Sequence, residues 1–317
     1  TTKAGWRGDA PNNGQEDRGW VFTFRVPFAS LGLSGPPSQG TVWGLGLVTY
    51  NRNSNTAGAP VNKTVWPEGL DAMRPASWGQ LHFGMPMRIA PAVPQGTVVI
   101  RNKQNGALVT DAAVGGGTNC GSGMDYWTQW GQSKITNMPY FNVQNQSDVS
   151  DWPCFSKYYV TFPLDALPRG KAIVSADFIL HNWGNAGEGW DPGPKPSFIQ
   201  VCSVGTSWTP DALSWNNAPM VRENLGGTWV NPVDAYPGYP GIPYTWDVSR
   251  AVEEAYAAGQ PLRLVVYSAD GPYHSGRYFY ASNTEDMNAE GRPTLRVTWG
   301  EVGDAPEPRG WLPLLLH

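Results

Sequence analysis

With 317 residues, a net charge of −4 and only 15% charged residues, the chain lacks the basic patch and the runs of like charge that nucleic-acid binding uses. Aromatic residues make up 12% of the chain, including 16 Trp, which excludes a disordered protein, and no stretch approaches the ~20 apolar residues of a membrane span. The 38 Gly and 29 Pro are mixed with Trp, Tyr, Val and Thr, a composition typical of short strands joined by ordered loops. We therefore expect an all-β protein with no nucleic-acid partner and no membrane span.

The first part of the chain contains three segments with strand character. Residues 20–26 (WVFTFRV) alternate apolar and polar side chains, as a half-buried strand does. Residues 41–50 (TVWGLGLVTY) are richer in apolar side chains, and residues 78–83 (WGQLHF) are typical of a closing strand. The proline-rich residues 89–95 predict a linker, so we expect a first unit over residues 1–88.

The second part has strand-like runs without intervening helices, a pattern that indicates an antiparallel sandwich. The predicted strands are residues 97–100, 157–162, 173–180, 197–202, 262–267, 277–280 and 294–299. One helix is predicted after Asp247, a natural N-cap, because apolar residues recur at helical spacing from Val248 to Tyr256 before Gly259. The predicted fold is thus two β-sandwich units of jelly-roll type, with one short helix in the second.

A specific motif then occurs at residues 206–219 (TSWTPDALSWNNAP). It resembles the W-T-E-x-x-V-T-W-N-N-A-P signature of the DNRLRE domain family, and residues 158–180, 245–252 and 291–299 are similar to further segments of that family in the same order. The resemblance covers residues 96–300 and implies a jelly-roll β-sandwich of extracellular bacterial proteins, some of which bind carbohydrate. Residues 301–317 then form a C-terminal tail, and an insertion of about 45 residues after Val114 departs from the family pattern.

Residues 17–32 (DRGWVFTFRVPFASLG) carry a second resemblance. Together with residues 40–44 and 75–81 they are similar to the C-terminal half of a family 9 carbohydrate-binding module. The N-terminal half of that module is missing, and Thr1 is not an initiator Met, so we expect the chain to derive from a longer precursor. A half-sandwich exposes sheet edges, which the rest of the precursor or another chain would have to cover.

The three cysteines bear on whether the protein works in an oxidising or a reducing compartment. Cys120 and Cys154 occur in loop contexts, whereas Cys202 lies in an apolar strand. One interpretation is a Cys120–Cys154 disulfide with Cys202 as a buried thiol, which implies an oxidising, extracellular or cell-surface location. The alternative is three free, reduced cysteines.

Motifs for catalysis and metal binding are missing from the sequence. The four histidines have no H-x-x-H or H-E-x-x-H spacing, and no nucleophile elbow or phosphate loop occurs. We therefore expect a protein without catalytic residues in this chain. A structural calcium ion has candidate ligands in Asp111, Asp125, Asp148 and Asp151, but the favoured interpretation of these residues is that they cap turns.

Aromatic residues in Gly- and Pro-rich loops are the strongest functional signal, because a Trp or Tyr ring offers a rigid apolar plate to the C–H face of a sugar. The candidate carbohydrate-binding residues are Tyr126, Trp127, Trp130, Trp183, Trp190, Tyr236, Tyr239 and Tyr273. The same side chains could instead anchor their loops to the core.

Three functional hypotheses follow. The first is a secreted, non-catalytic protein that binds a polysaccharide or cell-surface glycan through these loop aromatics. The second is a structural or adhesive surface protein that assembles with copies of itself or with the missing part of its precursor. The third is a pair of accessory modules of a larger polysaccharide-degrading enzyme.

Overall fold

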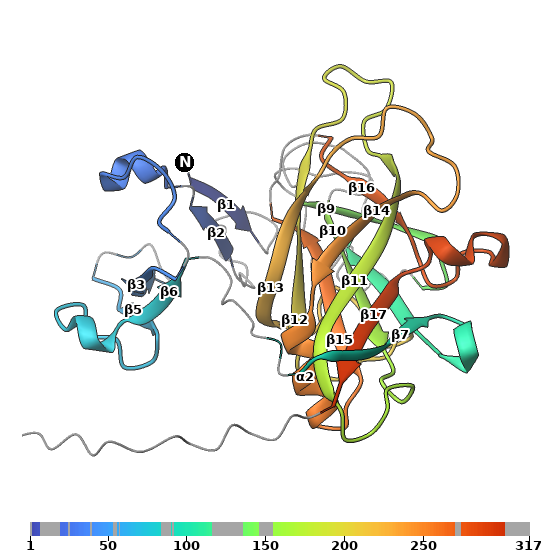
Figure 1. Cartoon of the computed structure of the whole chain (residues 1–317). Helices are drawn as coiled ribbons and strands as arrows, with labels where there is room; N and C mark the ends of the chain where they lie inside the picture. Colours follow the sequence, from blue (N-terminus) through green and yellow to red (C-terminus); the bar gives the residue numbers. More distant parts are fainter. Residues whose placement is uncertain are drawn as a thin grey trace, which may run out of the picture. The chain divides into compact units, whose positions relative to one another are not determined.

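The computed structural model describes residues 2–6, 20–24, 26–38, 40–52, 56, 58–83, 90, 92–115, 136–145, 155–269 and 274–301. Residues 89 and 91 of the predicted linker lie outside these residues, and so does the predicted tail after residue 301. The chain divides into two compact units, Thr1–Arg88 and Ile89–His317. Both are drawn in Figure 1, and each is described by itself below.

The strands of the first unit form three antiparallel sheets of two strands each. The pairs are β1 (Thr2–Trp6) with β2 (Trp20–Phe24), β3 (Val42–Leu45) with β6 (Gly79–His82), and β4 (Leu47–Arg52) with β5 (Val61–Trp66). Two 3-10 helices, η1 (Phe28–Leu31) and η2 (Pro75–Ser77), complete the described elements of this unit. The predicted strand over residues 41–50 is interrupted at Gly46, where a Cβ would meet Leu70 Cδ1 at 2.8 Å. Leu70 packs directly on this glycine backbone.

The second unit contains the longer strands. They are β7 (Pro94–Arg101), β8 (Thr110–Gly115), β9 (Tyr140–Asn145), β10 (Phe155–Phe162), β11 (Ala172–Asn185), β12 (Ser197–Val204), β13 (Val221–Val230), β14 (Ile242–Asp247), β15 (Leu262–Ser268), β16 (Arg277–Tyr280) and β17 (Thr294–Gly300). Each predicted strand corresponds to one of these, whereas β8, β9, β13 and β14 were not predicted as strands. Two 3-10 helices, η3 (Gln104–Gly106) and η4 (Asp286–Gly291), lie in connections.

These strands pair antiparallel in the order β13-β12-β15-β10-β9-β16-β11-β17-β7, with β8 added to β10 and β14 added to β11. In Figure 1 they curl around one another as long, twisted ribbons. The predicted all-β, sandwich-like fold class is therefore confirmed.

The core of the second unit lies between the curled layers. Phe162 of β10 meets Phe178 of β11 edge-on, with ring centroids 5.8 Å apart, and Phe178 also contacts Trp246 of β14. All three rings are buried together with alternate residues of the neighbouring strands. The alternation arises because successive strand side chains point to opposite faces.

A second, smaller apolar cluster covers the outer face of β8, β10, β12 and β15. Trp208, Leu213 and Trp215, from the connection between β12 and β13, pack on Tyr159, Val265 and Cys202. Asn217 braces this connection, since its side chain accepts from Ser214 N–H and donates to Ala212 C=O. The motif at residues 206–219 thus supplies a cover for the sheet. The predicted burial of Cys202 is confirmed.

The predicted helix is present as α2 (Ser249–Ala257), at one end of the strands (Figure 1). Its apolar side packs against β11 and β15, with Val252 fully buried. Asp247 Oδ1 accepts from Ser249 N–H at 2.8 Å, although the N-cap residue itself is Val248, and Gly259 ends the helix at a φ of 62°. The spacing of Arg250 and Glu254 suggests an ion pair within the helix. In the structure, each of the two residues instead forms an ion pair with a side chain of β13.

Candidate functional site

The aromatic residues predicted to contact a ligand divide into two groups. Four are described in the structure: Trp183, Trp190, Tyr236 and Tyr239. The other four lie outside the described residues, as do both cysteines of the predicted disulfide and three predicted calcium ligands: Tyr126, Trp127, Trp130, Tyr273, Cys120, Cys154, Asp125, Asp148 and Asp151.

Trp183 is in a strand and not in a loop, which corrects the sequence prediction. β11 runs on to Asn185 because a bulge at Trp183, between Asn182 and Gly184, keeps it paired with β16. The Trp183 ring stacks on Tyr278, with centroids 5.3 Å apart and planes inclined by 23°. It also meets Tyr140 edge-on at 5.2 Å. The bulge thus places Trp183 among tyrosines of two further strands.

Strand register explains why these tyrosines share one face. Tyr280 of β16 lies opposite Tyr140 of β9. The adjacent residues, Phe279 and Phe141, also lie opposite each other. Phe279 and Phe141 are buried in the core, so the alternating Tyr278 and Tyr280 point to the other face. The alternation of residues 277–280 (RYFY) could have indicated that both tyrosines share one face. From the sequence we predicted only a strand there.

Two predicted loop tyrosines complete the group. The Tyr236 hydroxyl lies 3.1 Å from the Tyr280 hydroxyl, and Tyr239 meets the Tyr280 ring edge-on at 6.0 Å. Their loop approaches closely because Gly241 has a φ of 96° and a Cβ there would meet Asn182 O at 2.9 Å. Tyr236 and Tyr239 remain 62% and 53% exposed. We call Tyr140, Trp183, Tyr236, Tyr239, Tyr278 and Tyr280 the aromatic cluster.

The cluster is polar at its edges, because five of its six members are tyrosines. Burial, followed by the hydrogen bond to Tyr236, raises the pKa of Tyr280, and the pKa of Tyr239 is also raised, so both phenols stay protonated. Two buried polar atoms on this face have no hydrogen-bond partner: Trp183 Nε1, a donor, and Asn142 Oδ1, an acceptor. Asn142 lies opposite Tyr278 in the register. The face therefore combines aromatic plates with unsatisfied hydrogen-bonding groups.

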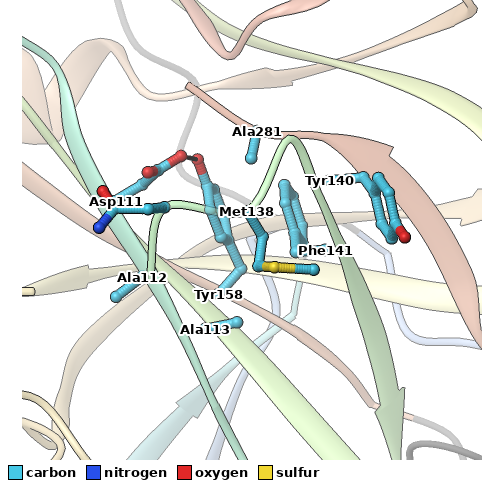
Figure 2. A pocket seen from close by; sticks show the side chains of 9 residues that line it. Asp111, Ala112, Ala113, Met138, Tyr140, Phe141, Tyr158 and Ala281 are labelled. Carbon is cyan, nitrogen blue, oxygen red and sulfur yellow. Dashed lines mark hydrogen bonds between the residues drawn. The ribbon is translucent and has the colours of Figure 1, made fainter. Parts of the chain in front are cut away.

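Asp111 lines a small pocket beside the cluster (Figure 2). Its carboxylate accepts from the Tyr158 hydroxyl at 2.5 Å and from Ser282 N–H and Oγ at 2.7 and 2.6 Å. Burial is the main cause that raises the pKa of Asp111. The rings of Phe141 and Tyr158, both labelled in Figure 2, are stacked with their centroids 3.5 Å apart.

The chemistry of this pocket is limited. Its volume is about 10 Å³, which is room for about one water molecule, and Asp111 is the one carboxylate among the nine residues that line it. A glycoside hydrolase needs a pair of carboxyl groups across a groove. Asp111 instead ties β8, β10 and the segment after β16 together. Both of its oxygens take part in these bonds, which gives Asp111 a structural role.

Trp190 lies in a separate loop and is 69% exposed. The described contacts join it to His274, with ring centroids 6.3 Å apart, and not to the aromatic cluster. Its loop is held by Arg277, a fully buried guanidinium that donates to the carbonyls of Val230, Gly276 and Lys195. The structure thus brings Trp183, Tyr236 and Tyr239 together and leaves Trp190 apart.

Within the described residues, no group of three or more His, Cys, Asp or Glu side chains is arranged to hold a metal ion. The same residues contain no helix that combines the length and apolar character of a membrane span. No protein-family model matches the chain, and no curated protein is significantly similar to it.

Proposed function

We propose that this chain is an extracellular, non-catalytic protein that binds a polysaccharide, and that the aromatic cluster is its binding site. The observation that carries the proposal is the position of Tyr236 and Tyr239. Both rings are more than half exposed, yet each is fixed against Tyr280, which belongs to a strand. The resemblance of residues 96–300 to DNRLRE domains supports the same ligand class.

Fixed, exposed rings suit sugars for a physical reason. A ring that is already held in place loses little conformational entropy when a pyranose stacks on it, so more of the contact energy remains as affinity. The hydroxyl groups of the exposed Tyr236 and Tyr239 add polar atoms at the edges of these rings. Each phenol hydroxyl can donate to and accept from a sugar hydroxyl.

Binding without turnover is proposed because the adjacent pocket offers a single carboxyl group. All the hydrogen bonds of Asp111 run to Tyr158 and Ser282. A substrate would have to break them before Asp111 could act as a general acid.

The proposal is tested with the double variant Tyr236→Ala, Tyr239→Ala on insoluble cellulose, xylan and chitin. We expect each lost anchor ring to weaken retention by about 1–3 kcal/mol, with an unchanged melting temperature. Tyr50→Ala is the matched control, because Tyr50 is equally exposed but belongs to the first unit. If the double variant is retained as well as the wild type, the aromatic cluster is not the site.

A structural or adhesive role is the second candidate, and one observation favours it. The first unit exposes apolar side chains on its two-stranded sheets, among them Leu47, Val61 and Trp66. Such surfaces promote contacts between protein chains. Sedimentation velocity separates the two roles: the structural role requires concentration-dependent assembly, and the binding role requires retention on a glycan by a monomer.

A further inference from the structure

A second aromatic surface lies on the outer face of β13, β12, β15 and β10. The register places Gly227 opposite Gln200 and Gln200 opposite Tyr267. Tyr158 pairs with Val266, so Lys157 comes beside Tyr267, and its Nζ lies 5.9 Å from the Tyr267 ring centroid. We call Gly227, Gln200, Tyr267 and Lys157 the cross-strand row. With neighbouring strands about 4.8 Å apart, the row extends for roughly 14 Å.

The row points away from the core. The residues that alternate with it along the same strands, Ile199, Val201, Val266 and Tyr158, are all buried in the core between the curled layers. Since side chains alternate across a strand, Gln200, Tyr267 and Lys157 must project from the opposite face. The connection that carries Trp208 and Leu213 covers the adjoining part of that face over Cys202, and Tyr267 packs at the edge of the covered cluster.

Aromatic side chains border the row at both ends. Phe198 and Trp229 form a cross-strand pair with ring centroids 5.3 Å apart, and Trp229, on the edge strand β13, is 56% exposed. At the other end, Lys157 Nζ lies 4.9 Å from the Trp215 ring centroid. The row is therefore a polar strip between two aromatic borders.

Gly227 gives the strip its flat surface. A Cβ at this position would meet the Phe198 ring at 2.6 Å and Gln200 Cγ at 3.2 Å. The Phe198 ring thus lies over the β13 backbone, where any side chain would displace it. At the neighbouring Gly226 a Cβ would meet nothing within 4 Å. Only one of the two glycines is therefore required by the packing of this face.

We propose that the cross-strand row, with Trp229 and Phe198, is a second binding site that takes a neutral polysaccharide chain lying across the strands. The ligand class rests on the function proposed above, but the site is separate from the aromatic cluster. Trp229 and Phe198 provide plates for pyranose faces, and the Gln200 amide donates to and accepts from hydroxyl groups. The Tyr267 hydroxyl bonds the Cys202 thiol, which fixes its ring in the row.

The charge of the row favours a neutral ligand over a polyanion. Lys157 is the one charged side chain among its four positions, and its ammonium lies against two aromatic rings. A polyanion is held by several cations that act together. One cation beside an amide and aromatic plates matches a hydroxyl-rich chain better.

The test measures retention of the full chain on insoluble xylan and cellulose, with polygalacturonate as the anionic probe. We expect Trp229→Ala to weaken retention on a neutral polysaccharide by about tenfold or more without a lower melting temperature. Met220→Ala removes another exposed apolar side chain, just before β13, and should have no effect. Equal retention of Trp229→Ala and the wild type overturns the proposal, and so does retention by polygalacturonate alone.

A pair of glycine variants tests the same site without removing a ring. Gly227→Ala should weaken retention severalfold because Phe198 is displaced from the strip, whereas Gly226→Ala should match the wild type. Equal effects of the two variants would contradict the proposal.

The Tyr236→Ala, Tyr239→Ala variant separates this proposal from the function proposed above. If Trp229→Ala alone loses retention, the second site stands and the aromatic cluster fails. If the tyrosine variant alone loses retention, the reverse holds, and a wild type that no glycan retains overturns both.

Discussion

The two units use similar strand sequences and bury very different amounts of them. In the second unit, two curled layers cover each other, and rings such as Phe162, Phe178 and Phe279 lose all contact with solvent. In the first unit, Leu70 is the one buried apolar side chain among the described residues, and Trp66 is half exposed. The difference shows that alternation of apolar residues makes a core only where a second layer covers the apolar face. Sheets of two strands provide no such layer.

Truncation of a core side chain should give the largest contrast between the units. Phe178→Ala is expected to lower the free energy of unfolding of the second unit by about 3–5 kcal/mol, because it removes contacts with Phe162 and Trp246 and leaves a cavity. Leu70→Ala should cost the first unit at most about 2 kcal/mol, because Leu70 already lines a pocket of about 230 Å³. Differential scanning calorimetry measures both, and equal losses would break the comparison.

A matched pair of serines should give the next largest contrast. Ser282 Oγ donates to the buried Asp111 at 2.6 Å, whereas Ser77 Oγ bonds the backbone of an exposed turn. Ser282→Ala should cost about 1–3 kcal/mol, because a buried acceptor loses its donor. Ser77→Ala should stay within about 0.5 kcal/mol. Chemical denaturation measures both changes, and a smaller cost for the buried serine would show that burial does not set the difference.

Acidification should weaken the second unit through His181. Burial, and next the positive charge of Arg101, lowers the pKa of His181, while Glu290 and the Gly291 backbone act in the opposite direction. The unfolded chain binds a proton near pH 6.5, and the folded chain binds it only at lower pH. Stability is therefore unaffected above about pH 7 and falls as the pH drops below about 6.5.

His181→Gln isolates this contribution. Thermal unfolding of the wild type and the variant is compared between pH 7.5 and pH 5. The variant should lose less stability over that range, and parallel curves would contradict the assignment to His181.

The smallest expected effect concerns the reactivity of the Cys202 thiol toward an alkylating reagent. Burial raises the pKa of the Cys202 thiol to about 11, so little thiolate is present at pH 8. Iodoacetamide should leave Cys202 unmodified in the native protein and alkylate it quickly in denaturant. Peptide mapping by mass spectrometry reads this site separately from Cys120 and Cys154. Rapid native alkylation would place Cys202 in an accessible part of the second unit.

The fold class was predictable because it depends on patterns that repeat along the chain. In the segments that contain Phe162, Phe178 and Val266, apolar side chains recur at the spacing that places them on one face of a strand. β13 escaped prediction because Glu223, Asn224 and two adjacent glycines have low strand propensity, and its partner β12 overrides that preference. Likewise, Trp183 looked like a loop residue because the bulge that keeps it in β11 depends on β16, nearly a hundred residues away.

The candidate sites were predictable only in part, for the same reason. Loop composition indicated Tyr236 and Tyr239, but not that both would meet Tyr280. Trp229 was not identified from the sequence, because its strand, β13, was itself not predicted. Its exposure is set by the strand pairing, which places it beside Phe198 on the outer face.

The position of β17 has a consequence for how the second unit is made. This last strand lies between β7 and β11, so that Thr294 faces Arg101 on one side and Ile179 on the other. β7 and β11 are synthesised before residues 294–300, so neither strand can pair with β17 until those residues have been made. Such distant pairing slows folding and leaves sheet edges open to other chains during synthesis. A circular permutant that joins the end of β17 to the start of β7 would make the two strands neighbours in the sequence. We therefore expect it to refold faster.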